Sequence, residues 1–125
     1  MWISCLWQTY HVLHHGRAEY TLIHPGNPPV VTKTVLGPNI EAGETRMLVV
    51  GTGIWKRSSL LDEDSKAAKT EEQKAATNCL ITEVVVPGFD WEDHQYMDRK
   101  ALEKLYKGVE HSGQRIEEFS KFVKQ

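Results

Sequence analysis

Short segments in which hydrophobic and polar residues alternate fill the first three quarters of the chain. In residues 18–24, Tyr20 and Leu22 fall on one side of an extended segment, and Thr21 and Ile23 fall on the other. Clusters of Pro, Gly and Asn separate such segments and predict turns. Regularly spaced strands joined by turns predict an all-β fold, either an antiparallel sandwich or a barrel. The predicted strands cover residues 3–13, 18–24, 30–37, 45–51, 53–61 and 79–89.

Residues 62–77 interrupt this pattern because they are charged and alanine-rich and contain no aromatic or β-branched apolar residue. A segment of this composition cannot bury an apolar face of its own. It predicts a solvated loop with at most a transient helical turn, and a functional lid is the alternative.

Residues 98–125 change to a helical period. Asp98 is placed to cap a helix, because its carboxylate can accept hydrogen bonds from the free N–H groups of the first turn. A second helix is predicted to begin near Ser112. We expect both helices to dock on a barrel domain formed by residues 1–97. Their apolar faces consist of Leu102, Leu105 and Tyr106 in the first helix and of Ile116, Phe119, Phe122 and Val123 in the second.

A length of 125 residues and a net charge of −2 describe a single domain without a strongly charged face. Lys and Arg are scattered, so we expect no nucleic-acid partner. No apolar run approaches the length of a membrane helix, and the first residues lack the features of a signal peptide, so we expect no membrane partner. Cys5 and Cys79 are the only cysteines, which favours a reduced, cytoplasmic protein over a disulfide scaffold.

The segment EVVVPGFDWEDH, residues 83–94, joins a valine run to aromatic and acidic residues. It has two interpretations, a metal or catalytic cluster and the exit of a strand from a barrel. Pro87 and Gly88 end the strand, and the acids that follow lack the glycine-spaced loop of a calcium site. We favour the structural interpretation, in which Asp93 and His94 hydrogen bond the turn. Phe89 and Trp91 would then close the barrel end beneath the first C-terminal helix.

Three segments carry a family resemblance: YHVLHHGRAEYTLIHPG, LVVGTGIWKRSSLL and CLITEVVVPGFDWEDH, which a Leu-containing helix follows. Over about residues 8–108 the chain resembles small RmlC-like members of the cupin superfamily from bacteria and fungi. The resemblance implies an all-β, cupin-type double-stranded β-helix (jelly-roll) barrel with C-terminal α-helices. It also implies a small-molecule pocket inside the barrel and, often, a dimer.

The chain departs from this family in two places. Relatives usually begin with several dozen further residues that include an early strand pair, and they have Pro-x-Gly where this chain has Gly51-Thr52-Gly53. A barrel that lacks strands leaves unpaired edges, which invite strand addition from another chain. We therefore expect a homodimer, formed by exchange of the strand from Trp2 to Leu13.

The resemblance also implies where a cupin metal would bind. Counting back from Gly16, the position of the family's Glu ligand falls at Thr9, or at Gln8 after an insertion, and the two His positions fall within residues 2–5, which contain no histidine. In the second motif, Lys56 stands where metal-binding members have His. A lysine ammonium repels a divalent ion, so we expect neither a metal nor another cofactor.

Strand alternation predicts which side chains face the pocket. If Lys56 points inward, Ser58 and Leu60 do so too, while Trp55 and Arg57 point outward; an error of one residue would exchange the two sets. The predicted catalytic residues are His11, Tyr20 and Lys56, and the predicted substrate-binding residues are Trp7, Tyr10, Ser58, Leu60, Glu83 and Val85.

This set predicts metal-free acid/base chemistry on a small molecule. His11 is the expected base, with Lys56 or Tyr20 stabilising negative charge as it develops, although His11 can also be interpreted as a hydrogen-bonded core residue. Analogy with RmlC-like sugar epimerases implies an isomerase, epimerase or cyclase of small-molecule biosynthesis, such as fungal secondary metabolism. The alternative functions are small-molecule binding without catalysis and service as an assembly subunit.

Overall fold

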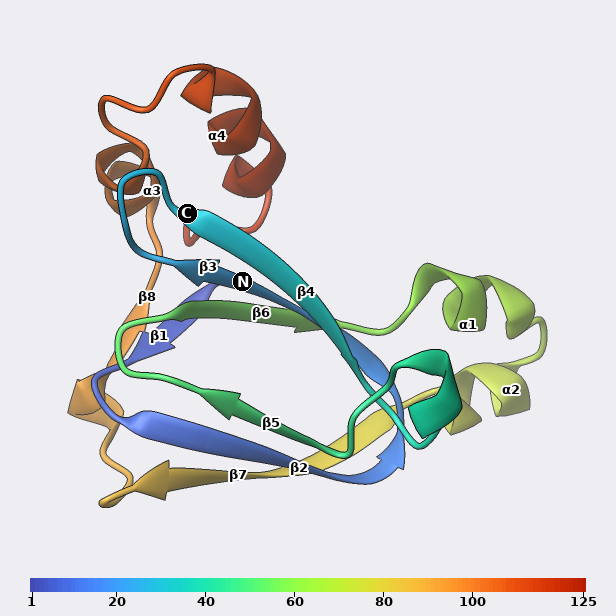
Figure 1. The fold of residues 1–125 in the computed structure, drawn as a ribbon. Coiled ribbons are helices and arrows are strands. Elements are labelled where there is room, and N and C mark those ends of the chain that lie inside the picture. Colours follow the sequence, from blue (N-terminus) through green and yellow to red (C-terminus); the bar gives the residue numbers. More distant parts are fainter.

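Two antiparallel β-sheets face each other in the computed structural model, which describes residues 1–125 (Figure 1). In chain order the strands are β1 (Ile3–Cys5), β2 (Gln8–Gly16), β3 (Ala18–His24), β4 (Val30–Leu36), β5 (Met47–Val50), β6 (Trp55–Ser59), β7 (Cys79–Val86) and β8 (His94–Tyr96). The five-stranded sheet, sheet A, has the order β4-β3-β6-β1-β8, and the three-stranded sheet, sheet B, has the order β5-β2-β7. This arrangement confirms the predicted all-β jelly-roll class.

The predicted strand over residues 3–13 is two strands that belong to different sheets. β1 pairs with β6 and β8 in sheet A, whereas β2 pairs with β5 and β7 in sheet B. The chain crosses between the sheets at Leu6 and Trp7, where the Leu6 N–H donates to the Asp93 carbonyl at 2.9 Å. The open edges belong to β4, β5, β7 and β8. Exchange of the strand from Trp2 to Leu13 would therefore have to break pairings that the single chain already makes.

Two C-terminal helices, α3 (Arg99–Leu105) and α4 (Ser112–Ser120), pack against sheet A. Asp98 caps α3 as predicted, because its carboxylate accepts from the Ala101 N–H at 2.7 Å. The core that the helices share with the sheet consists of Trp2, Ile23, Met97, Leu102, Tyr106 and Phe119. Both predicted helices are confirmed, and their apolar residues pack against this core. Phe122 and Val123 do so from the turn after α4, which ends at Ser120. None of the helices combines the length and the apolar character needed to cross a membrane.

A smaller hydrophobic cluster lies between the sheets near the turn that joins β2 to β3. Gly16 ends β2 with a φ of 76°, and a Cβ there would lie 1.7 Å from the Asn78 carbonyl oxygen, so the turn requires glycine. The cluster fills this end of the interior and leaves the part toward β8 to polar side chains and cavities. It consists of buried Ala18, Tyr20 and Leu36, with Leu13, Leu48, Cys79 and Ile81 packed around them.

Residues 62–77 form two short helices, α1 (Asp62–Ala67) and α2 (Glu71–Ala76), so the predicted loop is wrong. Neither helix contains a buried residue, which is why no apolar periodicity marks them in the sequence. Hydrogen bonds define α2 instead: the Thr70 hydroxyl accepts from the Gln73 N–H at 3.1 Å, and the Gln73 side chain accepts from the Thr70 N–H at 3.2 Å. Both helices lie at the end of the barrel away from β8 (Figure 1).

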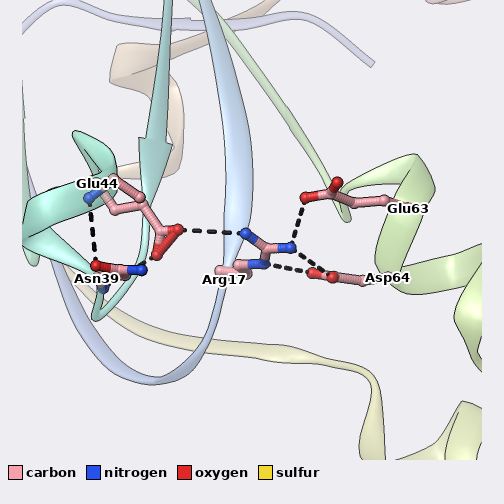
Figure 2. A network of polar contacts seen from close by, with 6 residues as sticks. Arg17, Asn39, Glu44, Glu63 and Asp64 are labelled. Atoms are coloured by element: carbon pink, nitrogen blue, oxygen red, sulfur yellow. Dashed lines mark hydrogen bonds and ion pairs between the residues drawn. The ribbon is translucent and has the colours of Figure 1, made fainter.

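Arg17 holds α1 against the barrel (Figure 2). Its guanidinium donates to both carboxylate oxygens of Asp64 at 2.7 Å and to Glu63 Oε1 at 2.6 Å. On its other side it donates to Glu44 Oε2 at 3.3 Å, and Glu44 Oε1 accepts from the Asn39 N–H at 3.1 Å. The cluster therefore connects the β2–β3 turn, the short 3₁₀ helix η1 (Ile40–Ala42) with its flanking loop, and α1.

Candidate functional site

A hydrogen-bonded network of polar side chains lies between the two sheets. Thr9, His11 and Glu83 reach it from sheet B, and Tyr20 and Lys56 reach it from sheet A. Thr9 and His11 alternate on one face of β2, and His11 lies directly opposite Glu83 of β7. All are buried except Glu83, whose side chain is 33% exposed. The structure thus brings the three predicted catalytic residues together, while their catalytic role stays a prediction.

Lys56 is the centre of this network and is only 4% exposed. Its ammonium group forms an ion pair with Glu83 Oε1 and donates hydrogen bonds to His11 Nε2 at 3.1 Å and to Thr9 Oγ1 at 3.4 Å. An ammonium group has three donors and no acceptor, so these partners use its full hydrogen-bonding capacity. The charge is tolerated inside the barrel because it is paired in this way.

His11 is neutral in this environment. Burial, reinforced by the positive charge of Lys56 and opposed by Glu83, lowers the pKa of His11 to about 4. Because Nε2 accepts from the Lys56 ammonium, we infer that the imidazole proton is on Nδ1. Nδ1 lies 3.3 Å from the Tyr20 hydroxyl oxygen and 3.8 Å from Glu83 Oε2. Both nitrogens of His11 are therefore engaged.

Tyr20 supplies a neutral phenol next to this imidazole. Burial, together with the charges of Cys79 and Glu83, raises the pKa of Tyr20 to about 12, and a hydrogen bond with Ser58 opposes this shift. Its ring packs edge-on against His11, with the ring centroids 5.2 Å apart. Since its oxygen accepts from His11 Nδ1 and from Ser58, its own O–H is free to donate to another group.

Two adjoining cavities open from the network. A polar cavity of about 170 Å³ is lined by residues that include His11, Tyr20, Lys56, Ser58, Ile81 and Glu83. An aromatic cavity of about 330 Å³ is lined by Ile3, Glu83, Val85, Phe89, Trp91, His94 and Tyr96. Ile3 and Glu83 line both cavities, so the two cavities adjoin at these residues. Of the predicted inward set, Lys56 and Ser58 line the polar cavity and Leu60 does not, whereas Arg57, predicted to point outward, is also among its lining residues. The predicted shared face of Glu83 and Val85 agrees with their place along the aromatic cavity.

Three of the predicted substrate-binding residues lie outside both cavities. Tyr10 is adjacent to His11 on β2, so its side chain points to the opposite face of the sheet. The Trp7 indole N–H instead donates to Asp93 Oδ2 at 2.7 Å. Leu60 follows the end of β6 and lines a groove of about 830 Å³ between β6 and α1. This groove is larger than either cavity, but it contains mainly exposed charged side chains and no residue of the network, so we place the site in the cavities.

Four further residues belong to the candidate site. Thr9 shares the inward face of β2 with His11, and strand alternation in the sequence could have predicted this because the two residues are two positions apart. Phe89 and Trp91 are 57% and 70% exposed, so their interpretation as plugs beneath a helix is wrong. His94 Nδ1 donates to the Asp90 carbonyl at 2.8 Å, which is the predicted turn contact, and its ring also lines the aromatic cavity. The sequence contains these aromatic residues but no pattern that shows whether they are covered.

The two-sheet fold and the position of Lys56 on β6 agree with the resemblance found in the sequence. Residues 1–97 match the sequence profile of the family described as Cupin superfamily (DUF985). This chain belongs to that family. Its two C-terminal helices lie beyond the matched residues of the cupin.

Known relatives of this cupin establish its fold but no activity. The uncharacterized protein YML079W of Saccharomyces cerevisiae is 34% identical over 87 residues, which cover 70% of this chain and 38% of the yeast protein. A hypothetical protein from Leishmania major has a similar structure, with a TM-score of 0.68 at 21% identity, over 91% of this chain and 66% of that chain. A protein from Shewanella oneidensis gives a TM-score of 0.61 at 16% identity, over 99% of this chain and 65% of that chain. The matched residues thus cover well under half of the yeast relative.

The donor set of this cupin does not fit a metal ion of the kind that metal-binding cupins hold. No group of three or more His, Cys, Asp or Glu side chains is placed to coordinate one. His11 and Glu83 are the suitable ligand types in the network, and the Lys56 ammonium contacts both of them. The Lys56 ammonium therefore occupies the position between His11 and Glu83 that a metal ion would need.

Proposed function

We propose that this cupin transfers a proton next to a carbonyl group of a small molecule, using its own side chains. The observation that supports this proposal is the arrangement around Lys56, where a buried ammonium, the Tyr20 phenol and the Glu83 carboxylate line one cavity. Isomerisation and epimerisation both begin with removal of such a proton, and ring closure through an enolate begins in the same way. The proposal therefore keeps the class of isomerase, epimerase or cyclase.

Glu83 fits the role of base better than His11. Neither nitrogen of neutral His11 offers a free lone pair, because Nε2 accepts from Lys56 and Nδ1 carries the proton. Glu83 Oε1 is paired with Lys56, but Oε2 has only the longer contact of 3.8 Å with His11 Nδ1. We therefore assign proton removal to Glu83 Oε2, and we assign to His11 the positioning of Lys56 and Tyr20.

Lys56 and Tyr20 complete the proposed reaction. As Glu83 takes the proton, the electron pair of the C–H bond moves to form a C=C bond, and the carbonyl oxygen becomes an enolate oxygen. The ammonium of Lys56 stabilises this negative charge, with the weak hydrogen bond to Thr9 as the one to be replaced. The Tyr20 O–H or the protonated Glu83 then returns a proton to carbon or oxygen, so the oxidation state of the substrate does not change.

Solvent deuterium incorporation into phenylpyruvate tests this proposal. Its methylene group lies next to a ketone, and NMR in D₂O follows the loss of the methylene protons. We expect the wild-type protein to exceed the rate in protein-free solution and Glu83→Gln to lower the catalysed rate by about a hundredfold or more, as loss of a general base does.

Glu41→Gln is the matched control for this experiment, because it removes the same charge from an exposed position in η1. It should keep the wild-type rate. A wild-type rate equal to that of protein-free solution, or a Glu83→Gln variant as fast as the wild type, would contradict the proposed proton transfer.

Ligand binding without catalysis is the second candidate function. It is favoured by the complete hydrogen bonding of Lys56, which makes a network that can recognise a ligand and leave it unchanged. This function predicts a rise in melting temperature with phenylpyruvate and no deuterium incorporation. A chemically changed ligand would exclude it.

The expected homodimer is also a proposal, and the outward face of sheet B supports it. The helices α3 and α4 cover sheet A, whereas Leu80 of β7 and Met47 of β5 stay 60% and 51% exposed on sheet B. Burial of such side chains favours association. We expect a dimer in light scattering at micromolar concentration and a monomer after Val84→Lys. A wild-type monomer would contradict the proposal.

A further inference from the structure

The rings of Phe89, Trp91 and His94, in the segment after β7, form a cluster that lies outside both hydrophobic cores. The ring centroids of Phe89 and Trp91 lie 4.9 Å apart with an interplanar angle of 81°, and those of Phe89 and His94 lie 5.1 Å apart with an angle of 45°. The centroids of Trp91 and His94 are 6.2 Å apart. These are the separations of mutually packed aromatic rings, so the rings hold one another in place.

Hydrogen bonds fix the backbone that carries these rings. Asp90 Oδ1 accepts from the Glu92 N–H at 2.9 Å at the start of the 3₁₀ helix η2 (Trp91–Asp93), and the Asp90 carbonyl accepts from His94 Nδ1 at 2.8 Å. The Trp7 indole N–H donates to Asp93 Oδ2 at 2.7 Å and ties η2 to the β1–β2 crossing. The rings are therefore held in an ordered position although Phe89 and Trp91 are largely exposed. An ordered exposed aromatic surface is suited to stacking against a planar partner.

The position of the ring cluster joins it to the polar network. Phe89, Trp91 and His94 line the aromatic cavity of about 330 Å³, and Glu83 forms part of both this cavity and the polar one. The aromatic cavity is lined by no charged group besides Glu83, whereas the polar cavity is also lined by Lys56, Arg57 and Tyr20. A ligand that fills both cavities must therefore have an apolar planar part and an oxygen-bearing polar end.

We propose that Phe89, Trp91 and His94 bind the planar apolar part of an aromatic keto acid or related carbonyl compound, whose oxygen atoms reach Lys56 and Tyr20. The identity of the polar end rests on the proposed function; the stacking surface rests on the ring geometry and the cavity alone. The cavity then accounts for the exposed aromatic residues of the EVVVPGFDWEDH segment. In this proposal, Trp91 makes the protein bind ligands that carry a ring more tightly than ligands that do not.

A comparison of phenylpyruvate with pyruvate tests this inference, because the two keto acids differ only by the ring. Calorimetric titration should show that the wild-type protein binds phenylpyruvate at least about tenfold more tightly than pyruvate. Trp91→Ala should remove most of this preference, and Trp91→Phe, which keeps a ring, should restore most of it. Ile40→Ala, which trims an exposed apolar residue in η1, should change neither affinity.

Four outcomes decide the inference separately from the proposed function. Phenylpyruvate binding that depends on Trp91, without deuterium incorporation, supports the stacking surface and contradicts the proton transfer. Deuterium incorporation into both keto acids that Trp91→Ala leaves unchanged contradicts the stacking surface and supports the proton transfer. The absence of saturable phenylpyruvate binding to the wild-type protein overturns the inference. A wild-type dimer that Trp91→Ala converts to monomers also overturns it, since the rings would then be covered by a second copy.

Discussion

Two clusters of charged side chains in this protein are each built around one cation and differ in their partners and surroundings. Around Lys56, one cation meets one carboxylate, a neutral imidazole and a phenol inside the barrel, beside two cavities. Around Arg17, one cation meets three carboxylates between the β2–β3 turn, the η1 loop and α1 (Figure 2). The first cluster joins two sheets, and the second joins three surface segments.

The difference lies in the hydrogen-bonding capacity that each cluster leaves unused. Arg17 directs its donors at Glu44, Glu63 and Asp64, all of which belong to segments that it holds together. The Lys56 cluster keeps the Tyr20 O–H and one oxygen of Glu83 available toward a cavity. A charged cluster with unused donors and acceptors facing a cavity is suited to chemistry, whereas one whose cation directs its hydrogen bonds at neighbouring segments of the fold is suited to stability.

The largest expected effect is on catalytic rate, which we expect to depend on the Lys56 cluster and not on the Arg17 cluster. Lys56→Met should lower the catalysed deuterium incorporation into phenylpyruvate by about a hundredfold or more, because the enolate then loses the charge that stabilises it. Arg17→Met should keep the rate within about twofold of the wild type, since Arg17 does not line either cavity. Circular dichroism must first show that both variants are folded. Equal losses of catalysed rate in the two variants would contradict the assignment of chemistry to the Lys56 cluster alone.

The next effect concerns stability between pH 6.5 and pH 4. Unfolded His11 binds a proton near its ordinary pKa of 6.5, whereas folded His11 does so only near 4. The unfolded chain therefore binds more protons in this window, and the free energy of unfolding should fall by about 3 kcal/mol as the pH drops through it. Urea denaturation at several pH values measures this slope. His11→Gln should flatten it, and an unchanged slope in that variant would argue against a buried neutral His11.

The smallest expected effect is the loss of stability when the Arg17 cluster is disrupted. Arg17→Met should lower the free energy of unfolding by about 1–2 kcal/mol, because it leaves buried Glu44 without its charged partner. Hydrogen exchange should show loss of amide protection in α1 with little change in β2. The hydrogen bonds from Arg17 hold the pKa of Asp64 below its ordinary value of 3.8, so this contribution is present above that pH and lost below it. Unchanged protection of α1 would show that Arg17 does not hold the helix.

Much of the barrel follows from local alternation in the sequence. The period of two on β6 places Lys56 and Ser58 inward, and the same period on β7 places Glu83 and Val85 together. The helix cap at Asp98 is equally local, because the side chain bonds the first turn of its own helix. Features of this kind need no knowledge of distant segments, which is why they could be predicted.

Features that depend on distant contacts could not be predicted in the same way. The crossing at Leu6 and Trp7 has no turn residue to mark it, and its position depends on a hydrogen bond to Asp93. The helix α1 has no apolar face and depends on Arg17, which lies 47 positions before Asp64 in the sequence. Whether Trp91 is covered or exposed depends on the path of the C-terminal helices, which pack elsewhere on sheet A.

The protonation state of His11 tests the central claim most directly, because both proposals place a neutral imidazole beside the Lys56 ammonium. Nitrogen NMR of the ¹⁵N-labelled protein at pH 6 reports the state of each ring nitrogen. We predict a neutral His11 with a protonated Nδ1 and an unprotonated, hydrogen-bonded Nε2, and no titration until the pH approaches about 4. The variant His11→Gln assigns the signal. An imidazolium that titrates near 6.5, or a proton on Nε2, would contradict the arrangement of the network.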